Sequence, residues 1–561
     1  MLRFIAPKLP GWSPSHAYLM GPDDLAIPAE VSLDNDVIQC VKRVEGAAAL
    51  AIQYPASILS PTPAATPNGI PLANPHAVTD GMLTLRTALL PDRKAPYLLT
   101  LELARHQVML MLTKLEEWAL FETAPTDPAM AKVDHARELY TAALVLLGRV
   151  GSGRFTPEAQ HAAQLALAAA IDAGEELALL SARVQHARRI SGELQLLASK
   201  PPPDSAITDH EVKLARKHQA GCAGVILGHA PKLGVAVPPA IFSPGLCAVV
   251  ESVADFVAIP MRWSQMEPNE GRYAFANTDR WIEWAVTKAK LPVVAGPVLD
   301  FEAGSVPDFV YVWEHDYESL RDVVIEHVKA LVTRYRRTVD TWTICGGLHI
   351  GSNFAISYEQ AVDLTRVCVT IVRKLHPSAK VQIEISQPWG EYTAEASARS
   401  ARSIPPAIYA ELLGQVQLEI DAIALKVQMG YPLPGRSTRD LMSFSSLLDR
   451  FAAMDKPVAL TMLGAPSAPV IAGPGQPGAG HWRGQWSETQ QAQWVARAGA
   501  IAAGKPYVQS ICWQEIIDSP PPSSPHGGLL TAAGVPKPGL AQLKALRDAL
   551  RSNAPLPGAQ R

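Results

Sequence analysis

Eight apolar runs, separated by stretches with helical periodicity, lie between residues 218 and 550. Near-continuous apolar runs are typical of parallel strands buried on both faces, and their alternation with helices is typical of a (β/α)8 barrel. Before them, residues 1–95 carry strand-like stretches and residues 96–205 carry helical ones. The sequence therefore predicts an α/β fold, with a (β/α)8 TIM barrel over 218–550 preceded by a small β module and a helical segment.

Short alternating stretches define the N-terminal module. They cover residues 29–44, 49–56 and 81–90, and connectors rich in Pro, Gly and Asn, such as residues 60–75, separate them. Alternation between turn-forming clusters is typical of half-buried strands. We therefore expect residues 1–95 to form a small antiparallel β-rich module.

The hydrophobic period changes after residue 96. Residues 98–121 carry apolar side chains at helical spacing, and residues 158–190 form an Ala- and Leu-rich stretch with few helix-breaking residues. We expect a helical hairpin or bundle here. The prolines of residues 199–205 exclude a helix and predict a linker.

The candidate barrel strands are residues 222–228, 255–263, 291–301, 339–345, 379–386, 420–429, 456–463 and 508–516. Helical stretches lie between them, for example at residues 278–290, 318–337 and 358–375. An open, doubly wound sheet is the alternative, but no Gly-x-Gly-x-x-Gly turn follows a strand. A barrel would place functional residues at the carboxyl ends of its strands.

The composition argues against several kinds of partner and site. A net charge of −3 gives no polyelectrolyte signature, which argues against nucleic acid. The six cysteines lie far apart without a CxxC pair, which argues against a zinc site or a disulfide framework. The N-terminus lacks an apolar signal-peptide core, and no apolar run reaches about 18 residues. We expect a cytoplasmic protein without a membrane span, a metal or a cofactor.

Six stretches of the barrel region resemble, in collinear order, motifs of glycoside hydrolase family 10, the endo-xylanase-type retaining barrels. They are residues 261–285 (MRWSQMEPNEGRYAFANTDRWIEWA), 293–301, 332–347, 376–386, 420–428 and 511–543. In the first stretch, Arg262 takes the place of the family's lysine. The resemblance implies hydrolysis of β-1,4-glycosidic bonds, with an oligo- or polysaccharide as the partner.

The departures from the family pattern fall on the chemistry. The resemblance assigns the acid/base glutamate to Gly347, the asparagine before it to Gly346, and the nucleophile to Met462. A glycine cannot donate a proton, and a thioether cannot form the glycosyl ester that a retaining mechanism requires. Supporting polar positions are also changed, to Pro297, Phe301, Lys426 and Gln428. We expect Gly347 and Met462 to face each other across the carboxyl end of the barrel.

Other carboxylates near strand ends could replace the missing pair. Glu384 and Glu391 are the first candidates for catalysis, because an apolar neighbour such as Trp389 could raise a carboxyl pKa toward that of a general acid. A separation of about 6.5–9.5 Å would favour inversion through an activated water. The structural alternatives are an ion pair between Glu384 and Lys426, and a capping or hydroxyl-binding role for Glu391.

Aromatic and polar side chains near strand ends are candidates for binding a sugar. Sugar rings stack on indoles, and their hydroxyls bind planar polar groups. Core packing is the alternative for Trp263 and Trp513, whereas we expect Trp482 on a surface or in a cleft. His349 could be a general base or simply a hydrogen-bonding group. The candidate binding residues are Arg262, Trp263, Asp300, Glu302, His349, Trp389, Lys426, Gln428, Trp482, Trp513 and Glu515.

Three functional hypotheses follow. The barrel could recognise a glycan without the standard catalytic pair, it could be an active glycosidase with relocated carboxylates, or it could be a structural scaffold. The N-terminal module could be carbohydrate-binding, or it could serve packing or assembly.

Overall fold

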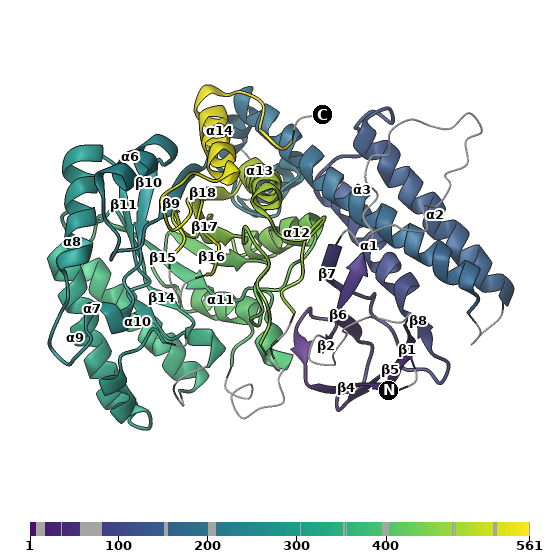
Figure 1. The fold of residues 1–561 in the computed structure, drawn as a ribbon, viewed down its shortest axis with the longest axis horizontal. Coiled ribbons are helices and arrows are strands. Elements are labelled where there is room, and N and C mark those ends of the chain that lie inside the picture. Colours follow the sequence, from purple (N-terminus) through teal and green to yellow (C-terminus); the bar gives the residue numbers. More distant parts are fainter. Residues whose placement is uncertain are drawn as a thin grey trace.

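A closed barrel of eight parallel strands forms the larger part of the protein (Figure 1). This computed structural model describes residues 1–6, 17–34, 36–56, 81–150, 155–199, 209–302, 304–351, 354, 356–394, 403–473, 476, 478–519 and 524–559. The barrel strands are β9 (Lys232–Ala236), β10 (Phe256–Ile259), β11 (Val293–Ala295), β13 (Thr341–Thr343), β15 (Lys380–Ile385), β16 (Ala422–Gln428), β17 (Val458–Gly464) and β18 (Val508–Trp513). They pair in this order, and β18 closes on β9, so the predicted (β/α)8 barrel is confirmed.

Helices connect the strands and cover the outside of the barrel (Figure 1). Ser, Thr or Asp residues open several of them; Ser357, for example, caps α10 together with Gln360 in a reciprocal capping box. The helices are α6 (Pro244–Val253), α8 (Ala276–Glu283) with its π-helical continuation η2 (Trp284–Ala289), α9 (Tyr317–Tyr335), α10 (Tyr358–Leu375), α11 (Pro406–Gln415), α12 (Leu441–Ala452), α13 (Glu488–Gly504) and α14 (Pro538–Ser552).

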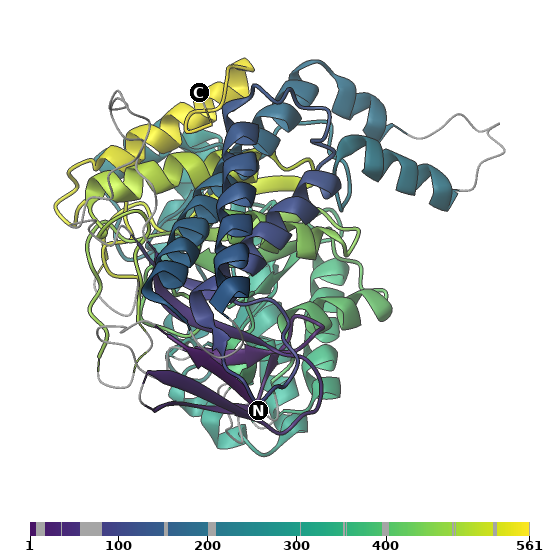
Figure 2. The same ribbon diagram turned by 90° about the vertical axis from the view of Figure 1, so that its right-hand side faces the viewer.

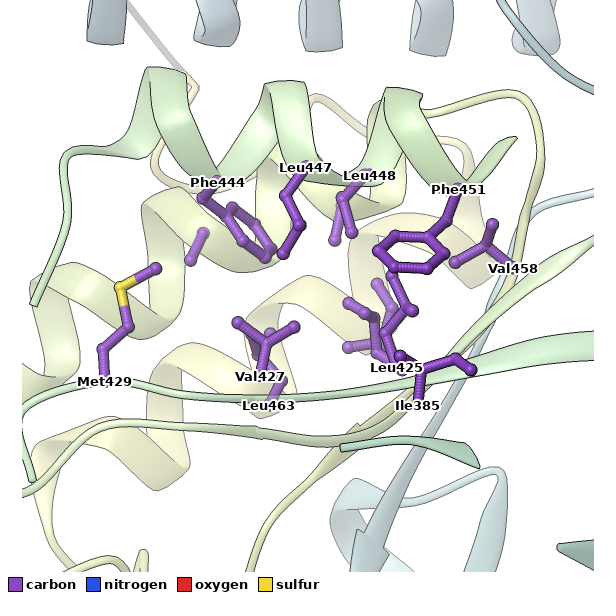
Figure 3. Packing of buried hydrophobic residues seen from close by; sticks show 14 of the residues in the cluster. Ile385, Leu425, Val427, Met429, Phe444, Leu447, Leu448, Phe451, Val458 and Leu463 are labelled. Atoms are coloured by element: carbon purple, nitrogen blue, oxygen red, sulfur yellow. The ribbon is translucent and has the colours of Figure 1, made fainter. Parts of the chain in front are cut away.

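Helix α12 illustrates how the helices pack on the barrel (Figure 3). Phe444, Leu447, Leu448 and Phe451 recur at three- and four-residue spacing, so one face of the helix is apolar. Figure 3 shows this face directed toward Leu425, Val427, Met429 and Leu463 of the neighbouring strands and their ends. All of these side chains are buried. Each Å² of apolar surface that they remove from water stabilises the contact between helix and barrel by about 25 cal/mol.

The first barrel strand differs from the prediction. Residues 222–228 form no strand, and β9 begins at Lys232 instead. The run 222–228 is an irregular segment, and its Leu227 amide donates to the Pro506 carbonyl (2.8 Å). Gly224 lies against Ala452 at the end of α12, where an added Cβ would approach the Ala452 Cβ to 2.8 Å. Contact with a helix end therefore explains why this run is apolar.

A short ribbon extends the third and fourth barrel strands at the carboxyl end. β12 (Leu299–Asp300) pairs in parallel with β14 (Cys345–Gly346), so Asp300 lies opposite Gly346. Short helical segments follow several strands: α7 (Trp263–Met266), η3 (Asp308–Trp313), η4 (Leu348–Ile350) and η5 (Glu391–Ala394).

The N-terminal module consists of two four-stranded sheets, ordered β4-β5-β1-β8 and β3-β2-β6-β7. Their strands are β1 (Leu2–Ile5), β2 (Ala17–Met20), β3 (Ala26–Ile27), β4 (Ala29–Asp34), β5 (Val37–Lys42), β6 (Ala49–Ala56), β7 (Gly81–Arg86) and β8 (Tyr97–Leu98). The pairings are antiparallel except between β1 and β8. The predicted connector 60–75 lies outside the described residues.

The helical segment lies beside the N-terminal module, and both lie against the barrel (Figures 1 and 2). Its helices are α1 (Leu99–Glu117), α2 (Pro128–Val150), α3 (Pro157–Ile190), α4 (Glu193–Ala198) and α5 (Asp209–Ala220). Buried ion pairs join it to the barrel: Asp449 of α12 binds both Lys114 of α1 and Lys505 (2.8 Å each). One hydrophobic cluster runs from Leu2 to Ala559 through all three parts. Most of the predicted linker 199–205 lies outside the described residues, and none of the described helices is long and apolar enough to cross a membrane.

Candidate active site

A cavity of about 860 Å³ opens at the carboxyl end of the barrel. Residues at or just after seven of the eight barrel strands line it, and Ile350 lines it from the turn η4 after the fourth strand; this end is where a (β/α)8 enzyme places its chemistry. Prolines and other apolar side chains form much of its wall. Its charged lining residues are Arg262, Asp300, Glu302, Glu384, Lys426, Arg436 and Glu515.

The two glycines after the fourth strand make room for carboxylates from neighbouring strands. An added Cβ on Gly346 would lie 3.3 Å from Asp300 Oδ1 and 3.3 Å from Glu384 Oε1. The carboxylates of Asp300 and Glu384 therefore both lie against Gly346. Gly347 has φ +70°, a left-handed conformation that favours glycine. Its Cβ would lie 2.9 Å from both the backbone N and the Cγ of Glu302. Residues that follow the third strand therefore occupy the space that side chains after the fourth strand would need.

Glu302 is a fixed anion in this cluster. Lys426 Nζ binds both of its carboxylate oxygens (2.9 and 2.8 Å), and Arg436 lies 3.3 Å from one of them. Burial acts to raise the pKa of Glu302, but Lys426 and Arg436 outweigh it and lower the pKa to about 2. Lys426 therefore forms its ion pair with Glu302 rather than with Glu384 as expected, although its charge also acts to lower the pKa of Glu384.

Asp300 supports the same turn. Its Oδ1 accepts the Glu302 amide (2.9 Å), and its Oδ2 accepts the Ser305 hydroxyl (2.8 Å). Burial and the neighbouring charge of Glu302 raise the pKa of Asp300.

Glu384 lies at the floor of the cavity. Its Oε2 accepts the Thr461 hydroxyl (2.6 Å) from β17, whereas its Oε1 lies toward Gly346. The side chain is 2% exposed, and burial raises its pKa to about 7. Glu384 and Met462 also line a second cavity of about 30 Å³ inside the barrel, which has room for a water molecule.

Glu515 follows β18 on another side of the cavity. Burial raises its pKa to about 7 as well, and its buried Oε2 has no hydrogen-bond partner among the described residues. Two further buried acceptors on the cavity wall, Gln387 Oε1 and Gln428 Oε1, also lack such a partner. Gln428 donates through its Nε2 to Gln514 and Ser524 (2.5 and 2.8 Å). These two hydrogen bonds fix the orientation of the amide and leave its Oε1 without a donor among the described residues.

Glu391 does not line the cavity, so its proposed place in the catalytic site is wrong. It forms an ion pair with Arg439 and accepts the Gly435 amide (2.6 Å), while the Tyr18 hydroxyl of the N-terminal module lies 3.4 Å away. Arg439 also donates to Tyr18 (3.0 Å). These contacts make Glu391 part of the junction between module and barrel.

The candidate tryptophans Trp263, Trp389, Trp482 and Trp513 also lie outside the cavity lining. Trp482 is fully buried and donates to Glu175 of α3 (2.7 Å), so the expectation of a surface or cleft position is wrong. Trp263 donates to Glu267 (2.9 Å), and Trp513 donates to the Gly527 carbonyl (3.0 Å), and both are core residues. Trp389 lies under the guanidinium of Arg439, 4.2 Å from its carbon.

His349 is a buried hydrogen-bonding residue and does not line the cavity. Its Nε2 lies 2.7 Å from the Ser386 carbonyl, and its ring stacks on Tyr409. Burial lowers its pKa to about 4, so the imidazole is neutral near pH 7. The other candidates do line the cavity, as does Met462: they are Arg262, Asp300, Glu302, Lys426, Gln428 and Glu515. Gly347 is not among the lining residues, because Glu302 packs against it. Of Gly347 and Met462, which we expected to face each other, only Met462 reaches the cavity.

Several lining residues carry no signal in the sequence. Arg436 comes from the loop after β16, and Ser305 from the loop after β12; their approach to Glu302 and Asp300 depends on loop paths. Thr461 and Met462 are adjacent in β17, so strict alternation would place only one of them inside the barrel; both line the small inner cavity, where the pairing of β17 with β18 is irregular. Among the described residues, no group of three His, Cys, Asp or Glu side chains is arranged to hold a metal ion.

Comparison with known proteins agrees with the motifs. The family model "Glycosyl hydrolase family 10" matches residues 255–346, from β10 to β14, and confirms the resemblance to that family. Xylanase 10B from Thermotoga maritima is 16% identical, with a TM-score of 0.42 over 58% of this chain and 95% of that one. A family 10 endoxylanase from a sugarcane soil metagenome is 14% identical, with a TM-score of 0.44 over 57% of this chain and 97% of that one. An intracellular xylanase from Thermoanaerobacterium saccharolyticum is 13% identical, with a TM-score of 0.40 over 56% of this chain and 95% of that one.

Proposed function

We propose that the cavity at the carboxyl end of the barrel binds an oligosaccharide of the β-1,4-linked kind that family 10 implies, and that the standard retaining pair is absent from it. Gly347 and Met462 would take the positions of the two family glutamates. The family match and the strand-end position of the cavity support a carbohydrate ligand. The cytoplasmic location expected from the sequence stays a prediction.

The observation that carries the proposal is the set of three unpartnered acceptors. Gln387 Oε1, Gln428 Oε1 and Glu515 Oε2 are buried, and all three belong to residues that line this cavity. A buried acceptor without a donor costs about 1–3 kcal/mol, so a ligand that brings donors gains affinity here. A sugar presents several hydroxyl donors on one rigid ring, so it can donate to all three acceptors. Stacking on tryptophan is not part of the proposal, because none of the described tryptophans lines the cavity.

Calorimetric titration with xylohexaose and cellohexaose tests the proposal. We expect one of them to bind, and Gln428→Leu to weaken its binding by about 3–10-fold, which corresponds to one hydrogen bond of about 0.5–1.5 kcal/mol. Gln415→Leu, at an exposed position at the end of α11, is the matched control and should bind as the unchanged protein does. Absence of binding to both oligosaccharides, or equal binding by the two variants, would contradict a saccharide site in this cavity.

A further inference from the structure

Two carboxyl groups of the cavity lie on strands related in the same way as the two family positions. Glu384 belongs to β15, and Glu515 follows β18; two strands, β16 and β17, separate them around the barrel. The fourth and seventh strands, β13 and β17, which precede Gly347 and contain Met462, are also separated by two strands. The arrangement is rotated by one strand, so the two carboxyl groups approach the one cavity from different sides.

Burial raises the pKa of both groups to about 7, so each can hold or release a proton near neutral pH. At Glu384, the charge of Lys426 and the Thr461 hydrogen bond oppose burial, whereas Glu302 and Asp300 add to it. At Glu515, Asp518 adds to burial, whereas a hydrogen bond from Ser519 and the charges of Arg262 and Lys537 oppose it. The hydrogen bonding of the two groups differs: the Thr461 hydroxyl fixes Glu384 Oε2, whereas Glu515 Oε2 has no partner among the described residues and can accept from a water molecule.

We propose that Glu384 and Glu515 act as general acid and general base in the hydrolysis of a bound glycoside by single displacement. This proposal rests on the proposed saccharide site. The carboxyl proton of Glu384 passes to the glycosidic oxygen while the bond from that oxygen to the anomeric carbon breaks, and the bond electrons leave with the oxygen. A water oxygen forms the new bond to the anomeric carbon from the opposite face, and Glu515 takes a proton from that water. Transfer of this proton through solvent to Glu384 restores the starting state.

Neighbouring groups orient one carboxyl group and leave the other open. Lys426 and Arg436 neutralise Glu302, so this carboxylate adds no net negative charge beside Glu384. Thr461 orients the Glu384 carboxyl by its hydrogen bond of 2.6 Å. The unpartnered Oε2 of Glu515 is available to a water molecule.

The first test needs no variant. Xylohexaose is incubated with the protein, and the anomeric proton of the new reducing end is followed by NMR from the start of the reaction. Inversion predicts that the α-anomer appears first. Early β-anomer would overturn single displacement, and binding without any hydrolysis would overturn the catalytic assignment while leaving the proposed saccharide site intact. Absence of binding would instead refute the proposed function.

Variants then assign the roles. Glu384→Gln should lower the rate on phenyl β-xyloside by about 10²–10⁴-fold but the rate on dinitrophenyl β-xyloside by less than about 10-fold, because a good leaving group needs no proton. Glu515→Gln should lower both rates by about 10²–10⁴-fold, since both substrates need an activated water. Glu326→Gln, exposed on α9, is the matched control. An equal loss on both substrates in Glu384→Gln would remove it from the acid role, and an unchanged rate in Glu515→Gln would remove it from the base role.

Discussion

Introducing a side chain at Gly347 should destabilise the protein for two separable reasons. The left-handed φ of +70° costs a non-glycine residue about 1–2 kcal/mol. The new Cβ would also approach the backbone N of Glu302 to 2.9 Å, closer than a Cβ comes to another heavy atom, and relieving such overpacking costs about 1–3 kcal/mol. We therefore expect Gly347→Ala to lower the free energy of unfolding by about 2–5 kcal/mol.

Gly192, at the end of α3, separates the two contributions. Its φ is +80°, but no atom lies within 4 Å of the position of an added Cβ. Gly192→Ala should therefore cost only about 1–2 kcal/mol, the conformational part. Urea denaturation of both variants measures the difference, and equal losses would refute the claim that Glu302 fills the space beside Gly347. For the same reason Gly347→Glu together with Met462→Glu should not produce retaining hydrolysis, which an assay on xylohexaose checks.

Three further predictions concern charged groups. Glu391→Gln should leave oligosaccharide binding unchanged but lower the free energy of unfolding by about 3 kcal/mol, because the largely buried Arg439 loses its ion partner; a changed Kd without a change in stability would return Glu391 to the ligand site. The pKa of Glu302 is lowered to about 2, so its ion pairs contribute stability above its unfolded pKa that is lost as the pH falls toward 2; Glu302→Gln should remove this part of the acid sensitivity in urea titrations. The pKa of Glu384 is raised to about 7, so between about pH 4.5 and 7 the folded state binds more protons than the unfolded state, and stability falls as the pH rises through this window. Glu384→Gln should flatten this decline. An unchanged slope would contradict burial of an ionisable group at this position.

The barrel could be predicted because its strands are buried on both faces and therefore leave a direct trace in the sequence. Seven of the predicted runs overlap β10, β11, β13, β15, β16, β17 and β18. The prediction of a strand at 222–228 was wrong because an apolar loop packed on a helix has the same composition as a buried strand. Periodicity alone cannot tell the two apart.

The site was less accessible to sequence reasoning. Glu384 could be found because strand alternation places it inside the barrel. Glu391 is only a few residues further along, yet the loop carries it out of the cavity to Arg439. The predictions for the strand-end tryptophans were wrong for a related reason. Position along a strand does not determine whether an indole points into the cavity or into the surrounding core. Trp482, for example, donates a hydrogen bond to Glu175, which lies on a helix more than 300 residues earlier in the chain.

Hydrogen bonds across the junction couple the N-terminal module to the cavity wall. The edge strand β7 pairs with a barrel loop through Met82 and His481, and the Thr84 amide donates to the Thr438 carbonyl (2.8 Å). Thr438 lies shortly after Leu433, Pro434 and Arg436, which line the cavity. The loop that shapes one wall of the pocket is thus held from outside the barrel. Sequence drift in the first hundred residues can therefore retune which ligands fit, without any change among the residues that touch them.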